Sequence, residues 1–273
     1  MDIIGFALVT GAGSGLGRAC AMAYAVEGAA GIVFADIDKD AAEKTSAESV
    51  SVAKHPTYQA IAIQVDVAEE ASVDNMISEM LKMFGRIDYA VNCAGIGVQA
   101  PAEVAESSVS EFQRFLQVNV LGMFLAIRAQ TRAMKAQDAR LVNQSNPRRG
   151  KTRGVIINMG SCSSYCATPH LGQYTTSKHA VLGLTRNAAL DCAPYDIRIN
   201  CLCPSWVDTP MVQRAIEGNP GLQSLIEKAI PIGRIAQPDE IADLVIFLSS
   251  PRSSYVTGSG WIIDGGTTLS VNT

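Results

Sequence analysis

Charged residues are scarce in this chain, and the two signs nearly balance. Asp, Glu, Lys and Arg make up 18% of the 273 residues and leave a net charge of −4, where ~25% charged residues is usual. A general nucleic-acid binder needs a basic surface for phosphates, so this class is excluded. Because 48% of the residues are hydrophobic, the chain can bury a large core and is not disordered over most of its length.

Long apolar runs are absent too. No segment reaches the ~20 apolar residues of a membrane-spanning helix. The start of the chain, Met1 to Gly5, lacks the basic residues and the apolar stretch of a signal peptide. We therefore expect no membrane contact and a cytoplasmic location.

Metal-binding patterns are also missing. The seven cysteines are scattered without a Cys-x-x-Cys pair, and there are only three histidines. This indicates reduced, mostly buried cysteines and no metal site. The alternative metal set Cys162, Cys166 and His170 has a spacing that matches no common zinc pattern.

The sequence does contain short apolar runs that alternate with longer amphipathic stretches. Seven runs rich in Val and Ile predict strands buried on both faces: Phe6–Thr10, Gly31–Ala35, Ala60–Val65, Ile87–Asn92, Gly154–Met159, Ile197–Cys201 and Trp261–Ile263. The stretches near 15–28, 39–53, 69–84, 108–136, 173–192 and 238–250 predict helices. This order predicts an α/β fold: a single doubly wound Rossmann-type domain over 1–273, with a seven-stranded parallel sheet and helices on both faces. Its cofactor half would be about 1–150 and its catalytic and substrate half about 151–273.

Residues 137–153 break this alternation. Six basic residues in and beside this segment stand against the single acid Asp138: Lys135, Arg140, Arg148, Arg149, Lys151 and Arg153. Asn143 to Gly150 is polar and loop-like, so we interpret 137–153 as a solvated surface insertion. A localisation signal or a site for an anionic partner is the alternative.

A glycine-rich turn follows the first predicted strand and opens the first helix. Its glycines are Gly11, Gly13, Gly15 and Gly17. Glycines allow a tight turn and close approach of a pyrophosphate, which the free N–H groups and the dipole of the helix N-terminus attract. Because Asp36 also stands nineteen residues after Gly17, the arrangement predicts a dinucleotide site.

Asp36, which closes the second strand, bears on the choice of dinucleotide. A carboxylate there accepts hydrogen bonds from ribose hydroxyls and repels a 2′-phosphate. Ile37 follows it, so no cation directly after Asp36 would hold that phosphate, and we predict NAD in preference to NADP. A helix N-cap or a solvated turn acid is the alternative interpretation of Asp36.

Tyr174 and Lys178 lie four residues apart and share one face of a predicted helix, while Ser161 ends the fifth predicted strand. A free phenol ionises only near pH 10. A lysine can therefore activate it only in a partly desolvated cleft, helped by the positive nicotinamide ring of an oxidised cofactor. Tyr174 would then exchange a proton with an alcohol or ketone whose oxygen Ser161 hydrogen-bonds. An ordinary surface pair of Tyr174 and Lys178 is the alternative.

These motifs stand in the order of the short-chain dehydrogenase/reductase family, which the chain resembles over almost its whole length. The residues that carry the resemblance are Thr10-Gly11-x-x-x-Gly15-x-Gly17, Asp36, Asp66-Val67, Asn92-Cys93-Ala94-Gly95, Asn119, Ser161, Tyr174-x-x-x-Lys178 and Pro204-Ser205-Trp206-Val207-Asp208-Thr209. The family often has Asn where this chain has Cys93, and Gly where it has Ser205.

The resemblance implies a catalytic set of Asn119, Ser161, Tyr174 and Lys178, in which Asn119 kinks its helix and holds a water. It implies cofactor contacts from Gly11, Ser14, Gly15, Leu16, Gly17, Asp36, Ile37, Asp66, Val67, Asn92, Ala94, Gly95, Tyr174, Lys178, Val207 and Thr209. It also implies a homotetramer or homodimer formed through the helices at 108–136 and 173–192.

Three segments would meet the substrate: 96–103, 162–172 and 205–230. The last would form a lid whose helix breaks at Gly218 to Gly221. The mostly apolar lining expected from these segments comprises Ile96, Val98, Tyr165, His170, Leu171, Trp206, Met211 and Val212. We predict hydride transfer between NAD and a neutral, moderately hydrophobic secondary alcohol or ketone. A non-redox protein of the same fold, a cofactor sensor or an isomerase or cyclase scaffold, is the alternative.

Overall fold

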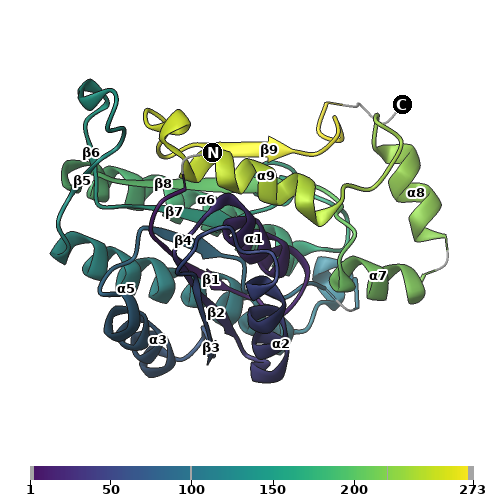
Figure 1. Cartoon of the computed structure of the whole chain (residues 1–273). Coiled ribbons are helices and arrows are strands. Elements are labelled where there is room, and N and C mark those ends of the chain that lie inside the picture. Colours follow the sequence, from purple (N-terminus) through teal and green to yellow (C-terminus); the bar gives the residue numbers. More distant parts are fainter. Residues whose placement is uncertain (1–2, 99, 220, 270–273) are drawn as a thin grey trace.

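The computed structural model describes residues 3–98, 100–219 and 221–269, and a seven-stranded parallel sheet forms its centre (Figure 1). The strands of this sheet are β1 (Phe6–Thr10), β2 (Gly31–Asp36), β3 (Gln59–Gln64), β4 (Tyr89–Asn92), β7 (Gly154–Met159), β8 (Ile197–Pro204) and β9 (Gly260–Ile263). All seven predicted strands are present. Gln99 and Pro220, which fall in the predicted substrate segments, lie outside the described residues.

The strand order is β3-β2-β1-β4-β7-β8-β9. The direction of winding reverses between β1 and β4, and in open parallel sheets ligands bind at such a point, beyond the carboxyl ends of the strands. The predicted doubly wound sheet is therefore confirmed. Strand β8 is longer than expected because Cys201 to Pro204 pair with Gly260 to Ile263 of β9.

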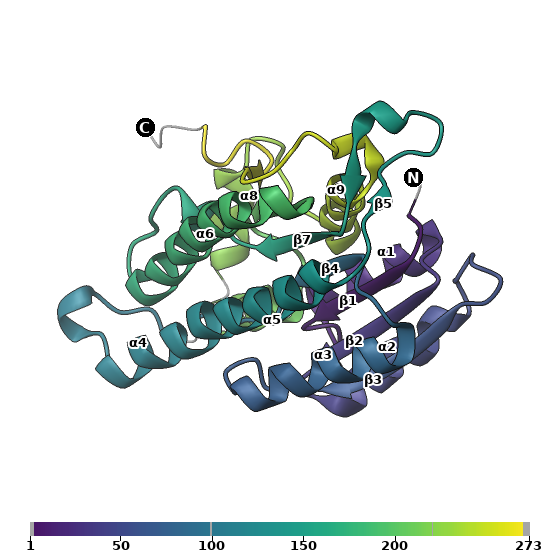
Figure 2. The same cartoon turned by 90° about the vertical axis from the view of Figure 1, so that its left-hand side faces the viewer.

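Helices cover both faces of the sheet (Figure 2). They are α1 (Gly15–Glu27), α2 (Lys39–Val50), α3 (Glu70–Phe84), α4 (Val109–Phe115), α5 (Gly122–Ala136), α6 (Gly172–Cys192), α7 (Pro210–Glu217), α8 (Leu222–Ala229) and α9 (Pro238–Ser249). Short 3-10 turns occupy Val104–Glu106, Pro147–Arg149, Cys162–Ser164, Ala193–Tyr195 and Pro251–Ser253. None of the described helices combines the length and the apolarity that crossing a bilayer requires.

Two hydrophobic cores lie on opposite faces of the sheet. Successive side chains of a strand point to opposite faces, so Leu8 of β1 packs with residues of α3, α5 and α6, whereas Val9 packs with residues of α1 and α9. Both cores consist mainly of buried aliphatic side chains, with a few aromatic and cysteine residues, and both take residues from β1, β2, β4, β7 and β8. This double burial explains the nearly continuous apolar runs of the sequence.

The helix predicted over 108–136 contains a π-helical segment. Regular helix ends at Phe115, six residues from Leu116 to Leu121 form the π segment, and α5 begins at Gly122. Asn119 is buried in the middle of that segment. Such π-bulges occur mostly at functional sites.

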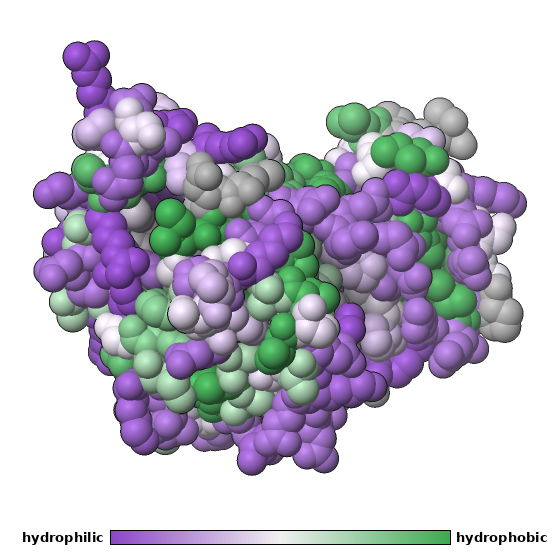
Figure 3. Space-filling model, viewed as in Figure 1, coloured by the Kyte–Doolittle hydropathy of each residue, from purple (hydrophilic) through white to green (hydrophobic). Residues whose placement is uncertain are grey.

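The predicted surface insertion at 137–153 contains a short antiparallel hairpin, β5 (Arg140–Leu141) and β6 (Lys151–Thr152), where a loop was expected. The hairpin directly precedes β7. It therefore lies at the amino ends of the parallel strands, opposite their carboxyl ends. Arg140 pairs with Asp88 at 3.6 Å and Arg153 with Asp196 at 3.4 Å. The hydrophilic tip of the hairpin projects from the molecule (Figure 3).

Helices α7 and α8 form the lobe that was predicted as a lid, and they stand apart from the body of the molecule (Figure 3). The break between them falls at Gly218 to Gly221, as predicted. Thr209 caps α7 by accepting from the backbone N–H of Val212 at 3.4 Å. The lobe follows the carboxyl end of β8, so it borders the edge where ligands bind in such sheets.

Candidate active site

The glycine-rich turn, residues 11–17, forms a cradle that side chains in place of its glycines would fill. Gly11 and Gly15 have φ of 71° and 51°, a region that favours glycine. A Cβ on Gly13 would lie 2.9 Å from Asp36 Oδ2, and a Cβ on Gly17 would lie 2.0 Å from the Gly11 carbonyl oxygen. Ser14 makes no side-chain cap at the start of α1. The first N–H groups of that helix therefore suit an anion such as a pyrophosphate.

Asp36 lies directly beside this cradle. Its carboxylate accepts hydrogen bonds from the backbone N–H of Gly13 at 2.8 Å and of Asp38 at 3.0 Å. The capping of α2 is done by Asp38, whose side chain accepts from Ala41, so Asp36 is not an N-cap. Ile37 is 64% exposed next to it. The contact between Asp36 and Gly13 joins the two features from which a dinucleotide site was predicted.

The next cofactor candidates lie at the ends of β3 and β4. The Asp66 carboxylate accepts from Ala68 N–H at 2.9 Å, and Val67 is buried against Gly122. The Ala94 N–H donates to Thr10 Oγ1 at 3.3 Å. A Cβ on Gly95 would lie 3.1 Å from Asn119 Oδ1.

Asn92 is turned into the core and away from the cradle. Its side chain exchanges hydrogen bonds with Gln130 and donates to Asn158 Oδ1 at 3.0 Å. Asn158 donates in turn to Thr185 Oγ1 at 2.9 Å. Through this network Asn92 supports the sheet, and its side chain has no free amide group for a ligand.

The loop after β8 reaches the glycine turn from the other half of the chain. A Cβ on Gly15 would meet Thr209 Cγ2 at 3.4 Å. Val207 is buried and pairs with Ala236 in an isolated bridge. Ser205, which stands where the family often has glycine, donates from its N–H to the Ile263 carbonyl at 3.2 Å. The fold thus brings both predicted cofactor segments to one edge of the sheet.

Ser161 lies two residues after β7 and caps the turn Cys162–Ser164. It is 6% exposed, and its hydroxyl oxygen accepts from Ser163 N–H at 3.1 Å. The hydroxyl hydrogen of Ser161 makes only a weak bond to Cys162 Sγ at 3.9 Å, so it can turn to donate to a substrate oxygen instead. Burial raises the pKa of the neighbouring Cys162 thiol to about 11, so Cys162 supplies no thiolate nucleophile near neutral pH.

Tyr174 and Lys178 lie on one face of α6, as predicted. Lys178 is 9% exposed, and its Nζ lies 5.5 Å from the centroid of the Tyr174 ring. The same Nζ donates to the Met159 carbonyl at the end of β7 at 3.0 Å. Phe115 packs its edge against the ring of Tyr174 with centroids 6.3 Å apart. The ammonium is therefore held in a buried position beside the aromatic ring, unlike the cation of an ordinary surface pair.

Asn119 connects the π segment to this helix. Its Oδ1 accepts from the Ile96 N–H at 2.8 Å, and its Nδ2 donates to the Ile96 carbonyl at 3.0 Å and to Ser177 Oγ at 3.2 Å. Ser177 donates to the Tyr174 carbonyl at 2.8 Å. Ser177 was not predicted as a site residue, although it stands inside the Tyr174-to-Lys178 motif, one residue before the lysine.

One predicted substrate residue lies elsewhere. The Tyr165 hydroxyl donates to the Gly260 carbonyl at 3.0 Å, and its ring lies 6.0 Å from the guanidinium carbon of Arg186. Arg186 is twelve residues beyond Tyr174 on α6, about 18 Å along the helix. Tyr165 is therefore directed away from the reaction edge, because its hydroxyl finds a partner at the start of β9.

Two other substrate segments do meet. A Cβ on Gly97 would lie 2.6 Å from the sulfur of Met211, so the lobe of α7 touches the segment after β4. The His170 carbonyl accepts from Ala102 N–H at 3.2 Å. Over the described ranges, no group of three or more His, Cys, Asp or Glu side chains is arranged to hold a metal ion, so Cys162, Cys166 and His170 form no such cluster.

Comparison with known proteins identifies the family. A family model described as enoyl-(acyl carrier protein) reductase matches residues 11–268. A short-chain dehydrogenase of Penicillium roqueforti (anuF) is 54% identical over 100% of this chain and 99% of its own length. One of Aspergillus ruber (fogB) is 55% identical over 98% of both chains. A 2,5-dichloro-2,5-cyclohexadiene-1,4-diol dehydrogenase of Sphingobium indicum is 38% identical over 96% of both.

Solved structures share the fold over nearly the whole chain. Levodione reductase superposes with a TM-score of 0.86 at 31% identity, over 97% of this chain and 98% of that one. The 3-ketoacyl-(acyl-carrier-protein) reductase of Brucella melitensis, solved with NADH, gives 0.82 at 33% identity over 96% and 98%. The gluconate 5-dehydrogenase of Burkholderia cenocepacia, solved with NADP and tartrate, gives 0.82 at 32% over 97% and 96%. The chain therefore belongs to the short-chain dehydrogenase/reductase family and is an oxidoreductase.

Proposed function

We propose that this protein transfers a hydride between NAD and a neutral, moderately hydrophobic secondary alcohol or ketone, with Tyr174 as the general acid and base. The observation that carries the proposal is the buried ammonium of Lys178, 5.5 Å from the centroid of the Tyr174 ring. A cation held out of water beside a phenol favours its ionised form. The named relatives that act on hydroxyl or keto groups support the same reaction class.

Each of the four proposed catalytic residues has its own role in the reaction. The chemistry that the dinucleotide supplies when bound is acceptance or donation of the hydride. Tyr174 takes the hydroxyl proton of the alcohol, or returns it to the oxygen of the ketone. Ser161 turns its hydroxyl hydrogen from the weak bond to Cys162 to that oxygen and stabilises the charge that develops there. Lys178 steadies the phenolate, and Asn119 holds the α6 segment through Ser177.

The preference for NAD rests on Asp36 and on the cations near it. A 2′-phosphate would meet the Asp36 carboxylate, which already lies against the glycine turn. Two nearby basic side chains are paired elsewhere: Arg18 with Glu48 at 2.5 Å, and Lys39 with Glu43 at 3.4 Å. To hold a phosphate there, Arg18 or Lys39 would have to leave its carboxylate partner.

The substrate would enter between the segment after β4 and the α7 lobe. This entrance presents Met211, 41% exposed, and Val104, 84% exposed. Apolar rims of this kind favour substrates with a sizeable hydrocarbon part. We therefore assign a neutral, moderately hydrophobic substrate, whose carbonyl or hydroxyl group reaches Ser161 and Tyr174.

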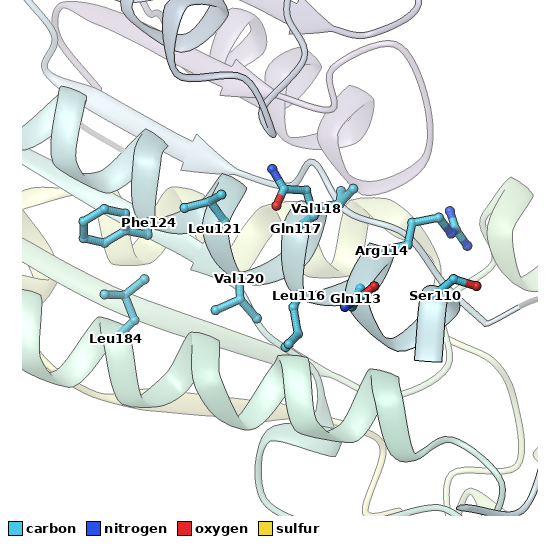
Figure 4. Close-up of a pocket in the computed structure, with 10 residues that line it drawn as sticks. All are labelled: Ser110, Gln113, Arg114, Leu116, Gln117, Val118, Val120, Leu121, Phe124 and Leu184. Atoms are coloured by element: carbon cyan, nitrogen blue, oxygen red, sulfur yellow. The ribbon is translucent and has the colours of Figure 1, made fainter. Parts of the chain in front are cut away.

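We further propose that the protein is a homotetramer or homodimer whose copies meet on α4, α5 and α6. A shallow groove of about 950 Å³ runs along the outer face of these helices, and its walls are mostly apolar (Figure 4). Leu184 of α6 points toward Phe124 and Val120 across it. Leu121 and Phe124 are 38% and 43% exposed in the single chain. A second copy would remove this apolar surface from water.

The test is a panel of cyclic, aliphatic and aryl ketones with NADH, and the matching alcohols with NAD, followed by absorbance of the reduced nicotinamide. We expect turnover by the wild-type protein and a fall in kcat of about 10²-fold to 10⁴-fold in Tyr174→Phe. Tyr255→Phe, whose ring is fully exposed, is the control. Undiminished turnover in Tyr174→Phe would rule out the proposed mechanism.

A further inference from the structure

Ser164 joins the two segments that carry the proposed reacting groups. Its hydroxyl oxygen accepts from the Ser161 backbone N–H at 3.3 Å, and its O–H donates to the Lys178 carbonyl at 2.8 Å. The first bond holds the segment that follows β7, and the second reaches α6. Ser164 is 3% exposed, so water does not compete for either bond.

The surroundings of Ser164 leave its hydroxyl little freedom. A Cβ on Gly160 would lie 3.0 Å from Ser164 Oγ and 2.9 Å from Cys203 Sγ. The turn that Ser164 ends is closed by its own N–H, which donates to the Ser161 carbonyl at 2.8 Å. The hydroxyl is thus packed between the strand end and the helix, and it holds a single position.

Few other side-chain hydrogen bonds fix the distance between Ser161 and α6. Lys178 Nζ donates a hydrogen bond to the Met159 carbonyl, but that bond positions the ammonium and not Ser161. The Ser161 side chain itself bonds only within its own turn, to Ser163 N–H and weakly to Cys162. The Cys203 thiol of β8 also contacts the Ser164 side chain and the Ser161 backbone, but it does not reach α6. The Ser164 hydroxyl is the side-chain link that joins the Ser161 backbone to α6.

We propose that Ser164 is a positioning residue that sets the distance of Ser161 from the Tyr174 and Lys178 pair. This inference rests on the proposed function, since it assigns Ser164 an effect on the step that those three residues perform. Misplacing a reacting group by about 1 Å costs ~10²-fold in rate. Removing the hydroxyl of Ser164 should therefore lower kcat by about tenfold to a hundredfold.

The experiment is a double-mutant cycle of wild type, Ser164→Ala, Ser161→Ala and the double variant, with the ketone of the panel that the wild type reduces fastest. We expect Ser164→Ala to lower kcat with little change in KM and in the dissociation constant of NADH. In the Ser161→Ala background the same change should cost much less, because the group that it positions is gone. An equal loss in both backgrounds, or an unchanged kcat in Ser164→Ala, overturns the proposal.

Ser163→Ala is the matched control. Ser163 belongs to the same turn and is 4% exposed, and its N–H bond to Ser161 is a backbone bond that the variant keeps. We expect kcat within about twofold of wild type. If Ser164→Ala does not fold, Ser164→Cys replaces it, since a thiol fills the space but donates weakly. A wild-type rate in Tyr174→Phe refutes the proposed function, whereas a full rate in Ser164→Ala beside an inactive Tyr174→Phe refutes only the role of Ser164.

Discussion

The side-chain amides of Asn92 and Gln130 donate to each other inside the core, at 3.0 and 2.7 Å. This reciprocal pair joins β4 to α5, and both residues are almost fully buried. Removing Gln130 leaves the Asn92 amide oxygen without its donor in a dry environment, which costs ~1–3 kcal/mol. The pair therefore holds the strand end that precedes the cofactor segment.

We predict that Gln130→Leu lowers the free energy of unfolding by about 1–3 kcal/mol, measured by urea denaturation. Gln223→Leu, where the amide is exposed on α8 and bonds Glu227, should change it by less than about 0.5 kcal/mol. If the two variants lose the same free energy of unfolding, burial does not make the hydrogen bonds of Gln130 more important than those of an exposed glutamine.

Asp36→Asn should weaken the binding of NADH and reduce the preference of the protein for NADH over NADPH. The variant removes the negative charge that would accept ribose hydroxyls and repel a 2′-phosphate. A hydrogen bond to a charged group contributes ~1.5–3 kcal/mol, so we expect the dissociation constant of NADH to rise by about tenfold to a hundredfold. Titration by nicotinamide fluorescence measures both cofactors. Asp38→Asn is the control, and tighter binding of NADPH than NADH by the wild type would contradict the NAD assignment.

Stability should fall at alkaline pH because the buried Tyr24 and Tyr89 and the half-buried Tyr58 are uncharged in the folded protein. Burial raises the pKa of Tyr58 and of Tyr89 to about 12, and raises that of Tyr24 well above its ordinary value. An unfolded phenol ionises near pH 10. The stability that these groups contribute is therefore complete below pH 10 and is lost as pH rises toward 12.

Thermal unfolding from pH 8 to 11 measures this loss, and phenolate absorbance reports the ionisation itself. We expect three phenols to ionise only as the protein unfolds. Tyr58→Phe should flatten the fall in stability above pH 10, because the substituted side chain cannot ionise. Phenolate absorbance that rises completely near pH 10, with the protein still folded, would disprove the buried state of these tyrosines.

Phe124→Glu should shift the protein toward smaller assemblies. Phe124 lies on the wall of the groove along α4, α5 and α6 (Figure 4). A charge at this position would have to be buried without a partner if a second copy covered the groove. Light scattering after gel filtration should show a mass falling toward the 28.9 kDa of one chain. Met83→Glu, a half-exposed position on α3 outside the groove, should leave the mass unchanged. If the wild type itself runs as one chain, the assembly proposal is wrong.

The sheet could be predicted from the sequence because burial on both faces leaves a simple signal. Runs such as Ile32 to Ala35 are apolar at every position, and only strands covered on both sides tolerate that pattern. The spacing of Asp36 from the glycine turn predicted a shared site, and adjacent parallel strands do bring their carboxyl ends to the same edge; the direct contact with Gly13 is a finding of the structure. Tyr174 and Lys178 share a helix face for a local reason as well.

What escaped prediction depends on contacts between distant segments. The resemblance implied a kink at Asn119, but the run Leu116 to Leu121 has an ordinary helical sequence, so the π form of that kink appears only in the structure, where Asn119 bonds Ile96. Tyr165 was misplaced because its partner, Gly260, is 95 residues away. The hairpin was read as a loop because each of its strands is two residues long, too short for any periodicity.

The hairpin of β5 and β6 projects from the molecule (Figure 1). It directly precedes the amino end of β7, whereas Ser161 follows the carboxyl end of that strand. The tip of the hairpin, Asn143 to Gly150, is polar and largely exposed, and exposed tips of this kind accept added sequence. A fluorescent domain or an affinity tag spliced in at this point would leave the chemistry intact, which gives the protein a ready attachment point for imaging or immobilisation.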